Sequence, residues 1–233
     1  MGEIHYSNQR VMVLAPHADD ETLGCGGVIQ KYTKNNSPVR VVIASFTLSV
    51  SKRYKKEAKA YGSYNGKNRF QELKEAMQLL GVVDYHILFK DQSGKQTYDS
   101  KLDGILRVEI VNRIERHIED FRPTIIYVPS ITKHQDHEAL HQAAVAATRP
   151  YFWNGTVLVY ETDGELSFLP NLYAPLTKDE MLGKMEALKA YQTQLGSILH
   201  PVHPDNLLHK AKFRGNQICE EYAEAFQVFR LRG

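Results

Sequence analysis

The sequence lacks several features that would mark a specialised class of protein. Its 233 residues include only two cysteines, which lie far apart in the chain, so neither a disulfide framework nor a cysteine-based metal site is indicated. No apolar run approaches the roughly 20 residues of a membrane-spanning helix, and the N-terminus lacks the basic and apolar regions of a signal peptide. We therefore expect a cytoplasmic protein without a membrane span.

Charge of one sign is not in excess either. The formal net charge is +2 and the sequence pI is near 8.4, whereas binding to nucleic acid or a membrane surface normally needs clustered basic residues. A basic run at residues 52–56 lies in a stretch without hydrophobic periodicity, which we interpret as a mobile, solvated loop. A lid that recruits an anionic sugar carrier is the alternative. Composition thus indicates no nucleic-acid partner, and no interface pattern reveals whether the chain forms a homo-oligomer.

Short apolar runs alternate with segments of helical periodicity along most of the chain. Runs typical of strands buried on both faces of a parallel sheet lie at residues 11–15, 39–46, 85–89, 124–128 and 156–160. Helices are predicted at residues 22–33, 69–80, 102–121, 133–148 and 178–194. Residues 195–222 are predicted to be irregular, and an edge strand is predicted within residues 223–229. The alternation predicts one α/β domain over residues 1–233, with a Rossmann-like, mostly parallel sheet and helices on both faces.

Two polar clusters directly follow predicted strands, one after residues 11–15 and the other after residues 124–128. They comprise His17, Asp19 and Asp20 in the first cluster, and His134, Asp136 and His137 in the second. Because open α/β sheets bind ligands where the carboxyl ends of parallel strands meet, we expect the two clusters to lie together. His17, Asp20 and His137 then supply two imidazoles and one carboxylate, the ligand set of a hydrolytic Zn2+ site, which also suits Fe2+.

The side chains left outside this ligand set suit proton transfer. Asp19 is the candidate general base, which takes a proton from water and passes it to a leaving group. We expect Asp136 to hold His134 in its protonated form, so that His134 donates to a developing oxyanion. Capping of the following helix is the structural alternative for any one residue of the first cluster. The pattern as a whole predicts a metal-dependent hydrolase.

Both clusters resemble the motifs of a known family. His17-Ala-Asp19-Asp20-Glu21, followed by Gly24-Cys-Gly-Gly27, is similar to (A/P)HPDDE, and His134-Gln-Asp136-His137 is similar to HxDH. These are motifs of the PIG-L/LmbE-like family of zinc-dependent N-deacetylases. The resemblance extends to residues 69–81, 184–194 and 222–226. Ala18 replaces the proline of the first motif, a change that removes no functional atom, so we expect metal binding to persist.

The resemblance implies an activity and a role for each site residue. Family members remove acetyl groups from N-acetylglucosamine-type sugars on varied carriers, so the implied substrate is an N-acetylated amino sugar or sugar conjugate. The implied roles are zinc binding by His17, Asp20 and His137, general base and acid catalysis by Asp19, stabilisation of the tetrahedral intermediate by His134 with Asp136, and substrate contact by Arg69. The sequence does not distinguish between four kinds of substrate: a free disaccharide, a thiol-conjugated glucosamine, a nucleotide sugar and a lipid-linked glycan.

Other interpretations of the same residues are open at this point. His137-Glu138-Ala-Leu-His141 satisfies HExxH, the zinc helix of many metalloproteases, but this assignment leaves the first cluster without a role. A non-catalytic metal- or sugar-binding module on the same fold is a further alternative. We interpret residues 24–27 as a site of close helix packing rather than as a dinucleotide-binding loop. Three later histidines are expected at the surface because of their irregular surroundings: His200, His203 and His209.

Overall fold

Seven strands of the described residues form one sheet. The computed structural model describes residues 4–46, 66–90, 101–163, 168–198 and 200–232. The strands are β1 (Val11–Ala15), β2 (Val39–Ile43), β3 (Asp84–Ile87), β4 (Ile125–Pro129), β5 (Thr156–Tyr160), β6 (Leu172–Leu176) and β7 (Tyr222–Arg230), in the order β3-β2-β1-β4-β5-β7-β6. β1 to β5 are parallel, and β7 runs antiparallel to both of its neighbours. The predicted α/β class and mostly parallel sheet are confirmed.

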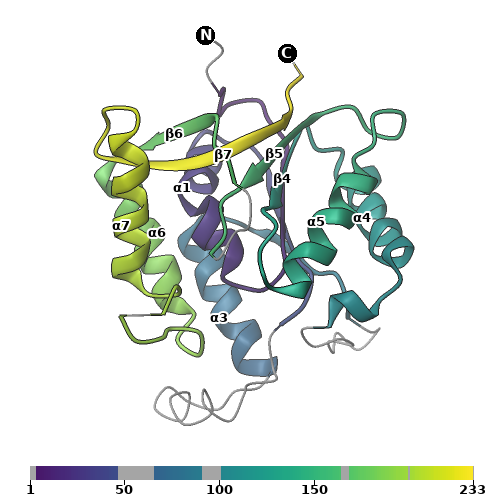
Figure 1. Ribbon diagram of the computed structural model, residues 1–233, viewed down its shortest axis with the longest axis horizontal. Coiled ribbons are helices and arrows are strands. Elements are labelled where there is room, and N and C mark those ends of the chain that lie inside the picture. The colour runs from purple at the N-terminus through teal and green to yellow at the C-terminus, as the bar shows by residue number, and fades with distance from the viewer. Residues whose placement is uncertain (1–3, 47–65, 91–100, 164–167, 199, 233) are drawn as a thin grey trace.

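Helices cover both faces of this sheet (Figure 1). They are α1 (Asp20–Lys34), α3 (Gly66–Leu79), the 3-10 helix η1 (Leu102–Gly104), α4 (Arg107–Phe121), α5 (Gln135–Ala147), α6 (Lys178–Ala190) and α7 (Pro204–Asn216). α1, α3, α6 and α7 cover one face, and α4 and α5 cover the other. Alternate residues of β1 enter the two cores, Val11 and Val13 on one face and Met12 and Leu14 on the other. No helix within the described ranges is long and apolar enough to cross a membrane.

The order of the strands reverses at β1 and β4, which lie side by side in the sheet. β1 pairs with β2 on one side and with β4 on the other, so Val11 lies opposite both Val39 and Ile125. The helices that follow these two strands, α1 and α5, pack on opposite faces of the sheet (Figure 1). Such a switch point leaves a crevice outside the carboxyl ends of the strands. The two polar clusters follow β1 and β4, and therefore meet at the carboxyl ends of these adjacent strands.

Helix α1 packs closely against the sheet through its glycines. A Cβ atom at Gly24 would lie 2.1 Å from Cδ2 of the Tyr160 ring, and one at Gly27 would lie 2.5 Å from a methyl carbon of Leu176. Both distances are far below van der Waals contact, so a larger residue would displace the helix or its neighbours. The interpretation of this stretch as a packing site is confirmed. Close packing fixes the start of α1, and with it the first cluster, relative to the sheet.

The last part of the chain differs from the prediction. The segment predicted to be irregular contains α7, which begins with Pro204 directly after its cap, His203, a position where proline favours a helix. β6 has the apolar sequence Leu-Tyr-Ala-Pro-Leu, in which Ala174 and Leu176 are buried and Pro175 between them is exposed, and its proline argues against a strand. The edge-strand prediction for residues 223–229 is wrong in its position, because β7 lies between β5 and β6 and β6 is the edge. Proline is tolerated on an edge strand, where one side of the backbone needs no partner.

Two predicted helices are shorter than their periodicity indicates. The segment from residue 102 begins as η1, passes through extended Ile105, and becomes α4 only at Arg107. The Leu102 N–H donates to Asp136 Oδ1 at 3.0 Å, which ties the start of this segment to the second cluster. α6 ends at Ala190 instead of residue 194. Two residues beyond its end bind other carboxylates, Tyr191 that of Glu21 and Thr193 that of Glu72.

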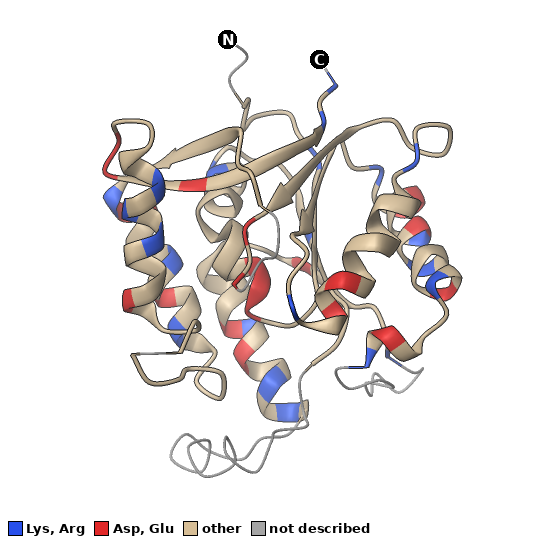
Figure 2. Ribbon diagram, in the orientation of Figure 1, with Lys and Arg blue, Asp and Glu red and all other residues tan. Residues whose placement is uncertain are grey.

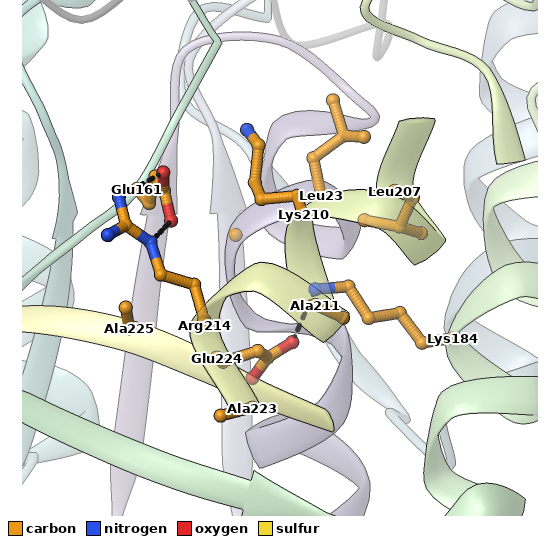
Figure 3. Close-up of a pocket in the computed structure, with 11 residues that line it drawn as sticks. Leu23, Glu161, Lys184, Leu207, Lys210, Ala211, Arg214, Ala223, Glu224 and Ala225 are labelled. Atoms are coloured by element: carbon orange, nitrogen blue, oxygen red, sulfur yellow. Dashed lines mark hydrogen bonds and ion pairs between the residues drawn. The ribbon is translucent and has the colours of Figure 1, made fainter. Parts of the chain in front are cut away.

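A buried ion pair joins α6, β7 and α1 (Figure 3). Lys184 Nζ lies 2.6 Å from Glu224 Oε1, and both side chains are 3% exposed. The Glu224 carboxylate also accepts the backbone N–H groups of Gly27 and Val28, at 2.7 and 2.8 Å. The Glu224 carboxylate therefore accepts from three donors, and Lys184 supplies the positive charge that offsets the cost of burying it.

Lys184→Met is expected to lower the free energy of unfolding by about 3–5 kcal/mol, because it leaves a carboxylate buried without its counter-ion. Chemical denaturation followed by circular dichroism measures the change. Lys189→Met is the matched control on the same helix, since it removes only the pair with Glu186, whose side chains are 48% and 57% exposed. We expect the control to change stability by less than about 1 kcal/mol. Equal losses in the two variants would contradict a stabilising role for the buried pair.

Candidate metal centre

The first cluster lies on a sharply bent loop between β1 and α1. Asp19 directly precedes the helix with φ 140° and ψ −30°, backbone angles that L-residues rarely adopt. Its side chain makes no capping hydrogen bond, so helix capping does not account for this carboxylate. Asp20 Oδ2 instead accepts the His17 backbone N–H at 3.1 Å. Figure 2 shows the acidic first turns of α1 and α5 in red.

Three side chains from the two clusters converge on one point. Asp20 Oδ2 lies 3.5 Å from His17 Nδ1 and 3.4 Å from His137 Nε2, and all three residues are buried. One ligand atom from each residue lies within 4.8 Å of the other two. Tetrahedral Zn2+ with bonds of about 2.0–2.1 Å separates its ligand atoms by about 3.3 Å. The donor types and their spacing therefore fit the metal ion that the sequence predicts.

Asp136 determines which nitrogen of His17 is available to a metal. Asp136 Oδ2 lies 2.9 Å from His17 Nε2, and Oδ1 accepts the Leu102 N–H at 3.0 Å. Because a carboxylate accepts, Nε2 of His17 carries a ring proton, and Nδ1, which faces Asp20, is the nitrogen whose proton a metal ion would replace. A carboxylate behind a metal-binding histidine is the usual way in which proteins orient such a ligand. Asp136 thus supports His17 from the far side of the ring.

The charges in this cluster favour a cation. Burial alone would raise the pKa of Asp20, but His137 and His17 outweigh burial and hold that pKa well below its ordinary value. Burial and the neighbouring Asp20 charge raise the pKa of Asp19 well above its ordinary value. Burial lowers the pKa of His17, but hydrogen bonds to Asp136 and Asp20 overcome it and raise the pKa to about 9. The raised pKa values mean that His17 and Asp19 retain protons, which reduce the repulsion between the carboxylates. A bound cation would reduce that repulsion in their place.

His134 adds a neutral donor beside the three converging ligands. Its ring centroid lies 4.8 Å from that of His17 and 5.3 Å from that of His137. Nδ1 accepts the backbone N–H of Asp136 at 3.2 Å, so Nε2 carries the proton of the neutral ring. Burial and the charge of His17 lower the pKa of His134. The structure differs here from our expectation that Asp136 holds His134 protonated, since the Asp136 carboxylate binds His17 and Leu102.

Comparison with known proteins identifies the family. Residues 12–148, more than half of the chain, match the family model described as PIG-L, GlcNAc-PI de-N-acetylase. The chain belongs to the PIG-L family. The matched residues include both clusters, so the resemblance carried by their motifs is confirmed, and the chain is placed in a family of deacetylases.

Several relatives of this PIG-L protein have deacetylase names. A probable N-acetyl-alpha-D-glucosaminyl L-malate deacetylase 2 of Bacillus anthracis is 25% identical over 207 residues, which cover 82% of this chain and 84% of the relative. The N,N'-diacetylchitobiose deacetylase from Pyrococcus horikoshii superposes with a TM-score of 0.73 at 21% identity, covering 95% of this chain and 84% of the other. The zinc-inhibited form of the teicoplanin deacetylase Orf2 gives a TM-score of 0.71 at 20% identity, covering 93% and 96%. The likeness to these solved structures shows a shared fold.

Arg69 of the PIG-L protein lies against the metal loop and is fully buried. Its Nη2 donates to the Ala18 carbonyl oxygen at 2.7 Å, and its Nη1 donates to Glu72 Oε2 at 3.1 Å. The family resemblance implies substrate contact for this residue. In the structure the guanidinium instead binds the backbone directly before Asp19.

The geometry of α5 does not support a metalloprotease. His141 Nδ1 lies 2.7 Å from the Pro129 carbonyl oxygen, and the exposed Glu138 accepts from Gln142. The described part of the chain holds two candidate metal-binding groups, His17–Asp20–His137 and His17–His134–Asp136, and His141 belongs to neither. The same is true of the three later histidines, His200, His203 and His209. The basic run at residues 52–56, considered as a lid, lies outside the described residues.

Sequence reasoning missed the partners of Glu21. This residue ends the first motif, is fully buried, and accepts the Asp19 N–H at 3.0 Å. The Tyr191 hydroxyl donates to the same carboxylate at 2.5 Å from 170 residues away. The motif marks Glu21 as a site residue, whereas Tyr191 falls in residues 184–194, a stretch to which the family resemblance extends without implying a role for Tyr191.

Proposed function

We propose that this PIG-L protein is a metal-dependent hydrolase that removes the N-acetyl group from an amino sugar or sugar conjugate. The observation that carries the proposal is the convergence of His17, Asp20 and His137 beside Asp19, a buried carboxylate outside that set. Membership of a deacetylase family supports the reaction class. The names of the relatives support an acetylated glucosamine conjugate as the substrate class.

The residues of the site suit each proton transfer of amide hydrolysis. His17, Asp20 and His137 would hold Zn2+ or Fe2+, which supplies Lewis-acid polarisation to water and to the acetamide carbonyl. Asp19 takes a proton from the attacking water as the water oxygen bonds to the carbonyl carbon. His134 donates its Nε2 proton in a hydrogen bond to the carbonyl oxygen as that oxygen becomes anionic. The C–N bond then breaks, Asp19 passes its proton to the departing amine, and acetate and the free amino sugar are released.

The raised pKa of Asp19 supports its assignment as the group that transfers protons. A group that accepts a proton and then gives it up works best when its pKa lies closer to the operating pH than that of an ordinary carboxyl. Burial and the charge of Asp20 raise the pKa of Asp19 in that direction. Asp20 faces the imidazole nitrogens of both His17 and His137, which suits the role of ligand.

Release of acetate from a panel of acetylated sugars tests the proposal. The purified protein is analysed for metals by mass spectrometry, and is then assayed with Zn2+ and with Fe2+, since both suit these ligands. The panel contains a free disaccharide, a malate conjugate, a thiol-conjugated glucosamine, a nucleotide sugar and a lipid-linked glycan. We expect at least one member to be deacetylated, with activity lost on chelation and regained on adding metal. Metal binding without acetate release from any member would favour a non-catalytic binding module.

A further inference from the structure

The peptide group between Ala18 and Asp19 is held on both sides. Its carbonyl oxygen accepts from Arg69 Nη2 at 2.7 Å, and its N–H donates to Glu21 Oε2 at 3.0 Å. Because a peptide group is planar, two hydrogen bonds at its opposite ends fix the orientation of the whole plane. This plane leads directly into the Asp19 backbone with its φ of 140°. A residue other than glycine keeps such a conformation only where its surroundings impose it.

The two side chains that hold this peptide are anchored by the segment after α6. The Tyr191 hydroxyl donates to Glu21 Oε1 at 2.5 Å. Thr193 donates its N–H and its hydroxyl to the Glu72 carboxylate, both at 2.7 Å, and Glu72 in turn accepts from Arg69 at 3.1 Å. One short segment thus supports both sides of the peptide, through two separate carboxylates.

We propose that Glu21, Arg69 and Tyr191 form a clamp that holds the Ala18–Asp19 peptide in its strained conformation and so aims the Asp19 carboxylate at the attacking water. All three side chains of the Asp19 clamp have 0% exposure, so they act through the loop rather than by touching substrate. The inference rests on the proposed function for the role of Asp19. Arg69 is then a positioning residue. The effect of the clamp on the conformation of the Ala18–Asp19 peptide can be measured without following the reaction.

Tyr191→Phe tests the clamp with little disturbance, because it removes one hydroxyl and keeps the ring. A small misplacement of a catalytic group costs up to about 100-fold in rate, so we expect kcat to fall by about tenfold while KM and metal affinity stay unchanged. Tyr32→Phe is the matched control, since Tyr32 is equally buried and its hydroxyl lies 3.0 Å from that of Tyr127. We expect the control to keep the parental kcat. Equal losses of kcat in the two variants would overturn the proposal.

Substitutions at the other two clamp residues separate positioning from alternative roles. Glu21→Gln keeps an oxygen for the Asp19 N–H, so it is expected to retain more of the parental kcat than Glu21→Ala. Arg69→Lys cannot bind the Ala18 carbonyl and the Glu72 carboxylate in one planar arrangement, and its kcat is expected to fall at unchanged KM. A raised KM with parental kcat in Arg69→Lys would assign Arg69 to substrate binding and overturn its place in the clamp.

Hydrogen exchange at the Asp19 amide, followed by NMR on the zinc-loaded protein, tests the clamp without a substrate. We expect slow exchange in the parent and in Tyr32→Phe, and exchange about tenfold faster in Tyr191→Phe, because one supporting hydrogen bond is lost. If the parent protein releases acetate from no sugar, the proposed function fails and this measurement still decides the clamp. Parental exchange rates in both Tyr191→Phe and Glu21→Ala would overturn it.

Discussion

Asp19→Asn is expected to bind metal as the parent does and to deacetylate its substrate about 10²–10⁴-fold more slowly, the factor that a positioned general acid–base group contributes. The amide has nearly the shape of the carboxylate but cannot accept a proton. The backbone N–H that Glu21 binds is unchanged by the substitution, so the loop is expected to keep its conformation. Measurement of kcat at saturating substrate, together with metal content by mass spectrometry, gives both quantities on one preparation.

Asp120→Asn is the matched control for this substitution. It makes the same chemical change at a side chain that is 73% exposed and pairs with Arg40, which also pairs with Asp84. The control is expected to keep the parental metal content and kcat. Parental kcat in Asp19→Asn would show that another group takes the proton from water. Loss of metal from Asp19→Asn would instead place Asp19 among the ligands.

The central sheet could be predicted because burial on both faces leaves a clear mark in the sequence. β1, β4 and β5 are continuous apolar runs, and each lies within one residue of its predicted position. β6 is also apolar in sequence, but Pro175 within it argues against a strand, and only Ala174 and Leu176 of this edge strand are buried. α7 buries only Leu207, Ala211 and Gly215, a stripe too narrow to stand out from its polar surroundings. Where one side of an element is exposed, tertiary contacts rather than periodicity decide its structure.

The candidate metal ligands could be predicted for a different reason. Charged residues directly after buried strands lose hydration unless they are bound, and the strand order brings two such strand ends together. The contacts around those ligands could not be predicted in the same way. Asp136 is close to His134 in the sequence, but its carboxylate reaches His17 from 119 residues away. That partner depends on the direction in which α5 leaves β4, which no local pattern of residues specifies.

His17→Ala is expected to abolish metal binding at this site and, with it, measurable acetate release. The substitution removes one of three converging donors and leaves Asp20 with His137 alone. Catalytic zinc sites normally keep three protein ligands, so the two that remain are not expected to hold the ion. Competition with a chromophoric chelator measures the affinity, and circular dichroism shows whether the fold is retained.

Two further variants, Asp136→Asn and His141→Ala, are expected to rank in metal affinity relative to the parent and to His17→Ala. The amide of Asp136→Asn lacks the carboxylate charge and offers one oxygen in place of the two that accept from His17 and Leu102. Loss of such a supporting partner weakens metal binding by about 10–100-fold, so this variant is expected to lie between the parent and His17→Ala. His141→Ala is expected to match the parent, because His141 binds the Pro129 carbonyl. Loss of metal binding in His141→Ala, with metal binding kept in His17→Ala, would assign the metal site to the HExxH residues of α5. Parental metal affinity in Asp136→Asn would mean that packing alone orients the His17 ring.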